Sequence, residues 1–267
     1  MSVAQPLAVD ALRVDTAVDI EHVSMRYGRG DAGTLALDDV SLQVGAGEFL
    51  CLLGRSGCGK STLLSLIGGL ERPTAGTIDV GGRRVGTMFQ DSSLFPWLTV
   101  AGNIELSLAL SGVPRRDRAS RVEELLDIVR LPGTERKRPH ELSGGMRQRV
   151  ALARTLAQDC QVLLMDEPFA ALDAITRDAM HDEIERIWME RELTVVFVTH
   201  NVREAVRLGD RVMLMKPSPG RMAREMVVDV PRPRRMDAPE IALRAAELHD
   251  ELDRQERLAT RTAEAVA

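Results

Sequence analysis

The stretch "EFLCLLGRSGCGKSTLLSLIGGL" (48–70) constrains the fold of this 267-residue chain more than any other feature. It has the pattern of a buried strand, a glycine-rich loop and the first turns of a helix, and the loop fits G-x-x-x-x-G-K-[ST]. In such a loop the glycines let backbone N–H groups converge on phosphate oxygens, and the helix N-terminus adds partial positive charge. We therefore predict a phosphate-binding loop made of Gly54, Arg55, Ser56, Gly57, Cys58, Gly59, Lys60, Ser61 and Thr62.

Three side chains of this loop have individual expected roles. Lys60 is expected to neutralise the outer phosphates of a nucleotide, and the Ser61 hydroxyl to reach a magnesium ion. Cys58 lies beside the helix N-terminus and Lys60, surroundings that lower a thiol pKa and raise its reactivity. We expect a bulky thiol reagent at Cys58 to block nucleotide binding, and bound nucleotide to protect the thiol. The alternative for the whole loop is a glycine-rich turn that binds nothing.

Short apolar runs alternate with longer helical patterns along the chain, which indicates an α/β fold with a mainly parallel sheet. Helical patterns occupy 145–158 and 172–192, whereas 92–142 contains the helical pattern "RASRVEELLDIVR" and no convincing buried strand. This segment is expected to be a helical insertion. Runs that read as strands buried on both faces are "EFLCLL" (48–53), "QVLLMD" (161–166), "TVVFVT" (194–199) and "RVMLM" (211–215).

Prolines at 217, 219, 231 and 233 mark the end of the main domain. We expect an N-terminal tail (1–16), a main domain (17–235) with a helical subdomain at about 92–150, and a C-terminal helical tail (236–267). In that tail an apolar stripe falls on one helix face, formed by Ile241, Ala245, Leu248 and Leu252.

Composition and charge narrow the class of protein and its compartment. The formal net charge of −5 argues against a nucleic-acid partner, and the basic clusters "RRDR" (115–118) and "PRPRR" (231–235) are expected to be solvated loop charges. Three cysteines without metal-ligand spacing fit a reducing compartment without structural disulfides. No apolar run reaches the ~20 residues that span a bilayer, and the N-terminus lacks a secretory pattern, so a cytoplasmic location is expected.

Polar residues follow two of the expected strands. Asp166 and Glu167 end "QVLLMDE", and His200 ends "TVVFVTH". Because ligands of doubly wound sheets lie beyond the carboxyl ends of the strands, Asp166 is placed to hold magnesium and Glu167 to face an attacking water. His200 is expected to sense the terminal phosphate. The alternatives are loop-forming carboxylates and a structural histidine.

A second anion cradle lies in "ELSGGMRQR" (141–149), where Ser143, Gly144 and Gly145 open an expected helix. With it, the chain closely resembles the ATP-binding subunit of an ABC (ATP-binding cassette) transporter over about residues 17–235. The matching elements occur in the family's order: the phosphate loop at 54–62, Gln90 after "GTMF", "LSGG" at 142–145, "LLMDE" at 163–167, "ALD" at 171–173 and His200.

The resemblance implies ATP as substrate, Mg²⁺ as cofactor and ATP hydrolysis as activity. It implies magnesium ligands at Ser61, Gln90 and Asp166, with Gln90 also sensing a membrane partner. Asp173 is implied to couple the halves of a dimer, and Tyr27 in "MRYG" to stack on adenine, with core packing as its alternative. In the family the "LSGG" of a second copy closes each ATP, so that two head-to-tail copies enclose two nucleotides.

Two departures from the family pattern are visible. Met146 stands where many members carry glutamine, which leaves the backbone cradle intact. The stretch "GTIDVGGRRVGTMFQ" (76–90) is shorter than usual, which puts the size of the small antiparallel β subdomain in doubt.

Two further stretches resemble the nitrate, sulfonate and taurine importer group: "SSLFPWLTVAGNIELSL" (92–108) and "KPSPGRMAREMVVDVPRPR" (216–234). In the first, Phe95, Pro96 and Trp97 are interpreted as a groove wall that grips a helix of a membrane permease, with core packing as the alternative. The implied partners are a second copy, multi-spanning permease subunits and, indirectly, a solute-binding protein, at the cytoplasmic face of the membrane. Rival hypotheses are a soluble ABC ATPase of DNA repair or translation, and an unrelated phosphate-loop kinase or GTPase.

Overall fold

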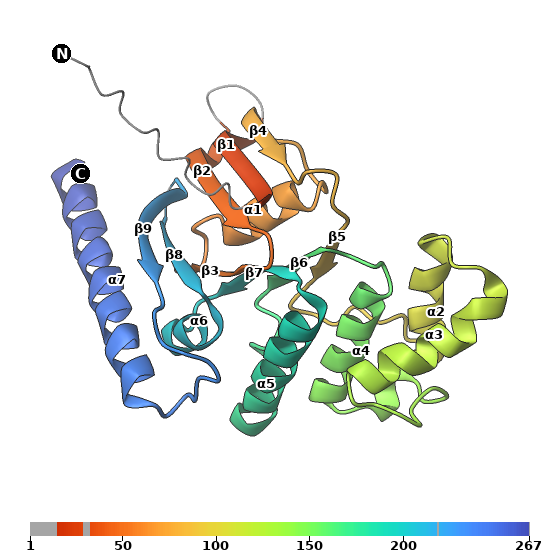
Figure 1. Ribbon diagram of the computed structural model, residues 1–267. Coiled ribbons are helices and arrows are strands. Elements are labelled where there is room, and N and C mark those ends of the chain that lie inside the picture. The colour runs from red at the N-terminus through yellow and green to blue at the C-terminus, as the bar shows by residue number, and fades with distance from the viewer. Residues whose placement is uncertain (1–14, 29–32, 218, 267) are drawn as a thin grey trace, which may run out of the picture.

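The computed structural model describes residues 15–28, 33–217 and 219–266, with side chains as far as Arg254. The expected N-terminal tail lies outside the described residues except for Asp15 and Thr16, and Thr16 already begins the first strand. Within the described ranges no helix is both long and apolar enough to cross a membrane. Two sheets and the helices around them form the body of the molecule (Figure 1).

The larger sheet has six strands in the order β5-β6-β7-β3-β8-β9. All its neighbours are parallel except β8 and β9, which form an antiparallel pair. The four runs expected to be strands are confirmed as β3, β6, β7 and β8. In full the strands are β3 (Phe49–Leu53), β5 (Val85–Met88), β6 (Val162–Asp166), β7 (Thr194–Thr199), β8 (Arg211–Lys216) and β9 (Arg221–Val227).

A separate three-stranded antiparallel sheet has the order β2-β1-β4, and its buried side chains share one core with those of β3 and β8. Its strands are β1 (Thr16–Tyr27), β2 (Thr34–Gly45) and β4 (Ala75–Asp79). The short stretch 76–90 supplies most of β4 and all of β5, joined by a turn in which Gly81 and Gly82 have positive φ. The antiparallel subdomain is therefore present, with three strands.

Alternation along the central strands builds one core on each face of the six-stranded sheet. On β3, Leu50 and Leu52 pack with α1 (Lys60–Ile67) and the antiparallel sheet. Phe49, Cys51 and Leu53 point to the other face and pack with α4, α5 and α6. These helices span Gly144–Leu156, Ala174–Arg191 and Val202–Leu208. Figure 1 shows them on the side of the sheet away from α1.

Residues 92–142 contain no strand, as predicted. They form α2 (Val100–Leu110), α3 (Arg115–Ile128) and a short 3-10 turn, η2 (Pro139–Glu141), before α4 begins. Apolar side chains of α2 and α3, among them Ile104 and Leu125, are fully buried and belong to the same core as α4. The helical segment thus extends from one end of the sheet (Figure 1).

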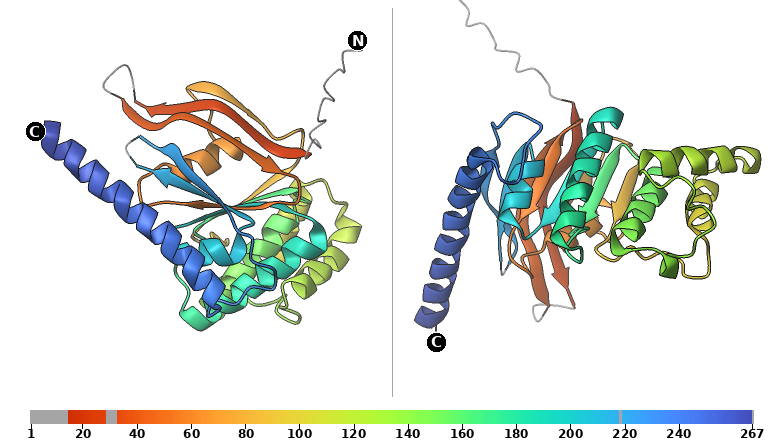
Figure 2. Two further views of the ribbon diagram at one scale, coloured as in Figure 1. Left: turned by 60° about the vertical axis from the view of Figure 1, so that its left-hand side comes forward. Right: turned by 90° about the horizontal axis from the view of Figure 1, so that it is seen from below.

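The last helix, α7 (Pro239–Val266), runs along the opposite end of the molecule beside β9 (Figure 2). Ile241, Ala245 and Leu248 are buried, and Leu252 packs against the same core. The apolar stripe predicted for this helix therefore faces the body of the protein.

The expectation that the basic cluster at 231–235 consists of solvated charges was wrong for Arg232 and Arg234, whereas Arg235 is exposed. Arg234 is only 5% exposed and donates to the carbonyl oxygens of Val228 (3.0 Å) and Gly209 (2.5 Å). The Arg232 guanidinium lies 4.4 Å from the ring centroid of Trp188 and pairs with Glu185 at 2.5 Å. The two arginines tie the chain before α7 to α5 and to the end of α6, because orphan carbonyls at a helix end accept such bonds.

Candidate functional site

The phosphate loop joins β3 to α1 at the carboxyl edge of the parallel strands. Gly59 caps α1 with φ 91°, a left-handed conformation that favours glycine. A Cβ at this position would come within 2.5 Å of the Leu37 side chain and 3.1 Å of the Ala36 carbonyl oxygen. Both the conformation and the close approach of β2 therefore require the glycine that the motif specifies.

The Lys60 ammonium is folded back over this loop. Its Nζ donates to the carbonyl oxygens of Gly54 (2.8 Å) and Arg55 (2.9 Å), and the residue is only 5% exposed. A buried ammonium needs such partners, because an unpaired buried charge is costly. These two bonds hold the positive charge at the loop, as its predicted contact with a phosphate requires.

A pocket of about 330 Å³ gathers the loop and the strand ends. It brings together the phosphate loop, Gln90 after β5, and the carboxylates after β6, which are far apart in the sequence. The convergence is a direct result of the parallel strand order, since β5, β6 and β7 end at one edge. The lining residues are Ala36, Ser56, Gly57, Gly59, Lys60, Ser61, Thr62, Gln90, Asp166 and Glu167.

Asp166 lies half-buried in this pocket beside Ser61. Burial raises the pKa of its carboxyl group, and a hydrogen bond with the Ser61 hydroxyl acts in the opposite direction. Together with Gln90, these residues offer a hydroxyl, an amide and a carboxylate oxygen. Such an all-oxygen donor set suits Mg²⁺, which is commonly held by one or two protein groups plus phosphate oxygens and water. The residues therefore fit the implied magnesium ion.

Glu167 adopts a strained backbone conformation at the end of β6. Its φ is 44°, and its N–H donates to the Val198 carbonyl oxygen of β7 at 3.1 Å. A non-glycine residue in this region costs about 1–3 kcal/mol and is common where function requires a fixed side chain. The Glu167 carboxylate lies 2.9 Å from Nδ1 of His200, so the structure brings these two predicted residues together.

Tyr27 ends β1 outside the pocket, and its hydroxyl donates to Glu71 at 2.5 Å. The residue is 40% exposed, so core packing, the alternative for this residue, is wrong. Adenine stacking by its ring stays a prediction.

The expectation that Cys58 carries a reactive thiol with a lowered pKa was wrong. The side chain is fully buried and packs in the core between the sheets. Burial raises the pKa of the thiol, and the nearby Lys60 ammonium, with Nζ 3.8 Å from Sγ, only partly opposes this effect. The lysine and the helix N-terminus lower a thiol pKa most where the sulfur is solvated; at Cys58 the effect of burial outweighs them.

Ser143 caps α4, accepting a hydrogen bond from the Met146 N–H at 3.2 Å. Gly144 and Gly145 follow in the first helical turn. None of these three residues lines the phosphate pocket described above. Gly144 instead lines a neighbouring hollow of about 360 Å³ with Leu172 and with Gln90, which lines both hollows. The glycines of "LSGG" (142–145), called the signature below, therefore do not line the phosphate pocket of their own chain.

Two supporting residues were missed by sequence reasoning. Gln148 of α4 donates to the Gln90 carbonyl oxygen at 2.9 Å and links the signature helix to the pocket. Buried Asn103 of α2 exchanges hydrogen bonds with the backbone of Phe95 at 2.8 and 3.2 Å. Neither carries a sequence signal, because an amide on a helix face looks like any other polar residue.

Asp173 lies at the N-cap of α5, where its side chain accepts from the Thr176 N–H at 3.0 Å. This bond lowers the pKa of the carboxyl group. The local structure thus gives Asp173 a capping role, and dimer coupling stays a prediction.

The aromatic residues before α2 are exposed on the helical segment. Trp97 is 67% exposed and Phe95 is 36% exposed, with ring centroids 5.3 Å apart. Core packing of Trp97, the alternative interpretation, is therefore wrong. Large exposed apolar side chains that gather in one place commonly mark a protein interface.

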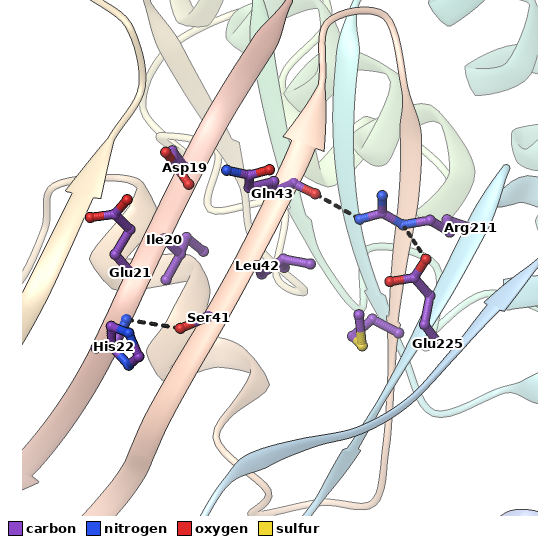
Figure 3. A pocket seen from close by; sticks show the side chains of 10 residues that line it. Asp19, Ile20, Glu21, His22, Ser41, Leu42, Gln43, Arg211 and Glu225 are labelled. Atoms are coloured by element: carbon purple, nitrogen blue, oxygen red, sulfur yellow. Dashed lines mark hydrogen bonds and ion pairs between the residues drawn. The ribbon is translucent and has the colours of Figure 1, made fainter. Parts of the chain in front are cut away.

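A larger pocket of about 590 Å³ lies elsewhere, between β1, β2, β8 and β9 (Figure 3). Arg211 crosses it, donating to the Gln43 carbonyl oxygen at 2.6 Å and pairing with Glu225 at 3.6 Å. This pocket shares no lining residue with the phosphate pocket and contains none of the predicted site residues. Size therefore does not identify the functional site; the convergence of motifs does.

Comparison with known proteins agrees with this geometry. Residues 37–170 match the family described as ABC transporter. The aliphatic sulfonates import ATP-binding protein of Bacillus licheniformis is 44% identical over 80% of this chain and 85% of its own length. The taurine import ATP-binding protein of Roseobacter denitrificans is 44% identical (79% and 81% covered). The nitrate import ATP-binding protein of a Synechocystis strain is 46% identical (74% and 77%).

Among solved structures, a dimeric, post-hydrolysis ATP-binding cassette bound to ADP and phosphate superposes with a TM-score of 0.70. It is 32% identical, over 80% of this chain and 99% of that one. Sequence, fold and site thus agree, and the chain belongs to the ABC transporter family as an ATP-binding, ATP-hydrolysing subunit.

Proposed function

We propose that this chain powers an ABC importer for nitrate, aliphatic sulfonates, taurine or a similar small solute. The relatives named for import of these three solutes support the group, and their near-equal identities leave the cargo open among them. The observation that carries the ATPase assignment is the single pocket shared by Lys60, Asp166 and Glu167, with His200 bonded to Glu167.

In this proposal the phosphate-loop N–H groups and Lys60 hold the phosphates of ATP. Mg²⁺, held by Ser61, Gln90 and Asp166, supplies charge neutralisation at the phosphates when bound. Glu167 orients the attacking water and accepts its proton, while His200 fixes the Glu167 carboxylate and faces the terminal phosphate. Phosphoryl transfer depends mainly on positioning and charge stabilisation. This suits Glu167, whose backbone N–H is bonded to β7 and whose carboxylate is bonded to His200.

The signature residues Ser143, Gly144 and Gly145 serve the ATP of a second copy. Their placement away from the chain's own phosphate pocket supports this, as does the likeness to a dimeric cassette. Backbone N–H groups at the start of α4 present donors and positive dipole to an anion. Asp173 couples the two halves of the dimer. It follows two residues after Ala171, which lines the same hollow as Gly144.

Membrane attachment comes from permease subunits that contact Phe95 and Trp97 at the cytoplasmic face, with a solute-binding protein acting through the permease. No nucleic-acid partner is proposed. The rival function, a soluble ABC ATPase of DNA repair or translation, gives no reason for the exposed Phe95–Trp97 pair. The import names of the relatives also count against it.

The test is co-expression with a permease encoded beside the gene, followed by purification from membranes. We expect the chain to copurify with the permease and to hydrolyse ATP, and Lys60→Ala to copurify without hydrolysing. A catalytically active chain that never associates with a multi-spanning protein would overturn the importer proposal and leave the ATPase assignment intact.

A further inference from the structure

Beneath the site, α5 carries a histidine that is not among the predicted site residues. His181 is fully buried, and its Nε2–H donates to a carboxylate oxygen of Glu204 on α6 at 2.5 Å. Glu204 is itself buried, and its second carboxylate oxygen accepts from the Thr199 hydroxyl at the end of β7. A continuous chain of side-chain hydrogen bonds therefore runs from α5 through α6 to β7.

This chain ends next to His200. Thr199 immediately precedes His200. The Thr199 Oγ1 also accepts a hydrogen bond, at 2.9 Å, from the N–H of Asn201, which immediately follows His200. Asn201 in turn caps α6 by accepting from the Arg203 N–H at 3.0 Å. The backbone on both sides of His200 is thus held by the hydroxyl that Glu204 orients.

The same imidazole supports the segment that follows Glu167. The rings of His181 and Phe169 meet edge to face with centroids 5.6 Å apart, and Phe169 is 1% exposed. Arg177, one helical turn before His181, donates to the Phe169 carbonyl oxygen at 3.2 Å. One face of α5 therefore fixes the position of the chain two residues beyond Glu167.

A purely packing role does not explain a histidine here. Its Nδ1 is buried without a hydrogen-bond partner, the nearest carboxylate oxygen of Asp178 being 3.7 Å away. A buried polar atom left unpaired destabilises a fold by about 1–3 kcal/mol, whereas an apolar residue of similar volume avoids the loss. What the imidazole adds over leucine is the directional bond to Glu204.

We propose that His181 is a positioning residue for ATP hydrolysis, holding Glu167 through Phe169 and His200 through Glu204 and Thr199. The inference rests on the proposed roles of Glu167 and His200. It makes a fully buried side chain a determinant of the distance between Glu167 and His200.

The test compares His181→Leu, which keeps volume and removes the bond, with His181→Gln, whose amide retains a donor. We expect His181→Leu to lower kcat about 10- to 100-fold, the scale of a small misplacement of catalytic groups. The KM for ATP should change less than about threefold, and His181→Gln should keep most of the activity. Met180→Leu, a volume-conserving change of the neighbouring buried residue, is the matched control.

A double variant separates positioning from general destabilisation. In a His200→Ala background, His181→Leu should lower the residual single-turnover rate much less than in the wild type, since coupled residues are not additive. Equal kcat in wild type and folded His181→Leu, or full additivity with His200→Ala, would overturn the proposal. Should His181→Leu fail to fold, Thr199→Val gives the same test at the other end of the chain of bonds. If the wild type and Lys60→Ala hydrolyse ATP equally, the proposed function itself fails, which is a distinguishable result.

Discussion

The carboxylate of Glu167 and the imidazole of His200 lie 2.9 Å apart, although 33 positions separate them in the sequence. They meet because β6 and β7 are neighbouring parallel strands whose carboxyl ends coincide. Glu167 is the more buried of the two side chains, 20% exposed against 58% for His200. The carboxylate is thus held from the strand side by its backbone and from the solvent side by the imidazole.

Glu167→Gln is expected to lower ATP hydrolysis by about 10²–10⁴-fold, the scale for losing a general base. ATP binding should persist, because the phosphate loop and Lys60 are untouched. The measurements are steady-state phosphate release and binding of a fluorescent ATP analogue, with Lys60→Ala as the variant that loses binding. Near-normal turnover by Glu167→Gln would refute the role of Glu167.

Cys58 is expected to react slowly with a bulky thiol reagent in the folded protein at neutral pH. The thiol is fully buried and its pKa is raised, so both access and the thiolate fraction are low. Unfolding in denaturant should increase the labelling rate by orders of magnitude. Mass spectrometry of Cys58-containing peptides gives the rate, with model thiols at the same pH as reference. Fast labelling of the native chain would contradict the buried environment.

The contrast between Cys58 and the strands shows which features could be predicted from sequence. Strands β3, β6 and β7 are continuous apolar runs, so their burial on both faces is readable locally. The phosphate loop and the carboxylates at strand ends follow from the same local pattern. Cys58, however, is buried in a core formed with β2 and the larger sheet, and the residues next to it in the sequence do not indicate this burial.

Long-range partners account for the other differences. From sequence alone Arg234 is predicted to be a solvated charge, because the backbone carbonyl oxygens at the end of α6 that accept its hydrogen bonds are distant in the sequence. Gln148 finds its acceptor 58 positions away, and His181 finds Glu204 23 positions away. Such pairings depend on how helices pack on the sheet, and amphipathic patterns give the buried face of a helix without naming its polar partners.

Magnesium-dependent nucleotide binding is expected to weaken as the pH falls. The loss should begin at a higher pH than it would if Asp166 had the pKa of an ordinary aspartate. Burial raises the pKa of Asp166, so its carboxylate begins to protonate earlier as the pH drops, and a protonated carboxyl holds Mg²⁺ poorly. Binding of ATP is measured with and without Mg²⁺ across the acidic range.

Asp166→Asn controls for protonation of ATP itself, because the nucleotide titrates equally with both proteins. The variant should lack the Asp166-dependent part of the magnesium effect at every pH. If wild type and variant show the same magnesium dependence throughout, Asp166 is not a magnesium ligand.

Trp97→Ala is expected to leave the isolated protein intact and to weaken its association with the permease. The side chain is 67% exposed, and surface substitutions usually change the free energy of unfolding by no more than about 0.5 kcal/mol. Large aromatic anchors often dominate an interface. Thermal melting and ATP binding of the purified variant are compared with its recovery in permease complexes. Exposed Leu110, at the end of α2, offers a matched control as Leu110→Ala.

The signature glycines are expected to act on the ATP of a second copy. Gly144 and Gly145 lie outside the phosphate pocket of their own chain, so the anion that they are predicted to hold is expected to belong to another copy. Specific ATPase activity of the purified chain should therefore rise with protein concentration until dimers saturate. A proven monomer with a concentration-independent rate would contradict the dimer mechanism.

A mixing experiment makes the same point with defined chains. Gly144→Asp places a carboxylate in the cradle, and Gly144 is the better site because a Cβ there approaches Leu172 no closer than 3.3 Å. At Gly145 the Cβ would come within 2.4 Å of Thr176, which would disturb the start of α5. Lys60→Ala and Gly144→Asp chains should each be inactive alone. Mixed, they should recover activity above either, because one heterodimer site combines an intact phosphate loop with an intact signature. Two Lys60→Ala preparations mixed under the same conditions give the baseline, and recovery must depend on total concentration if the shared site forms between copies.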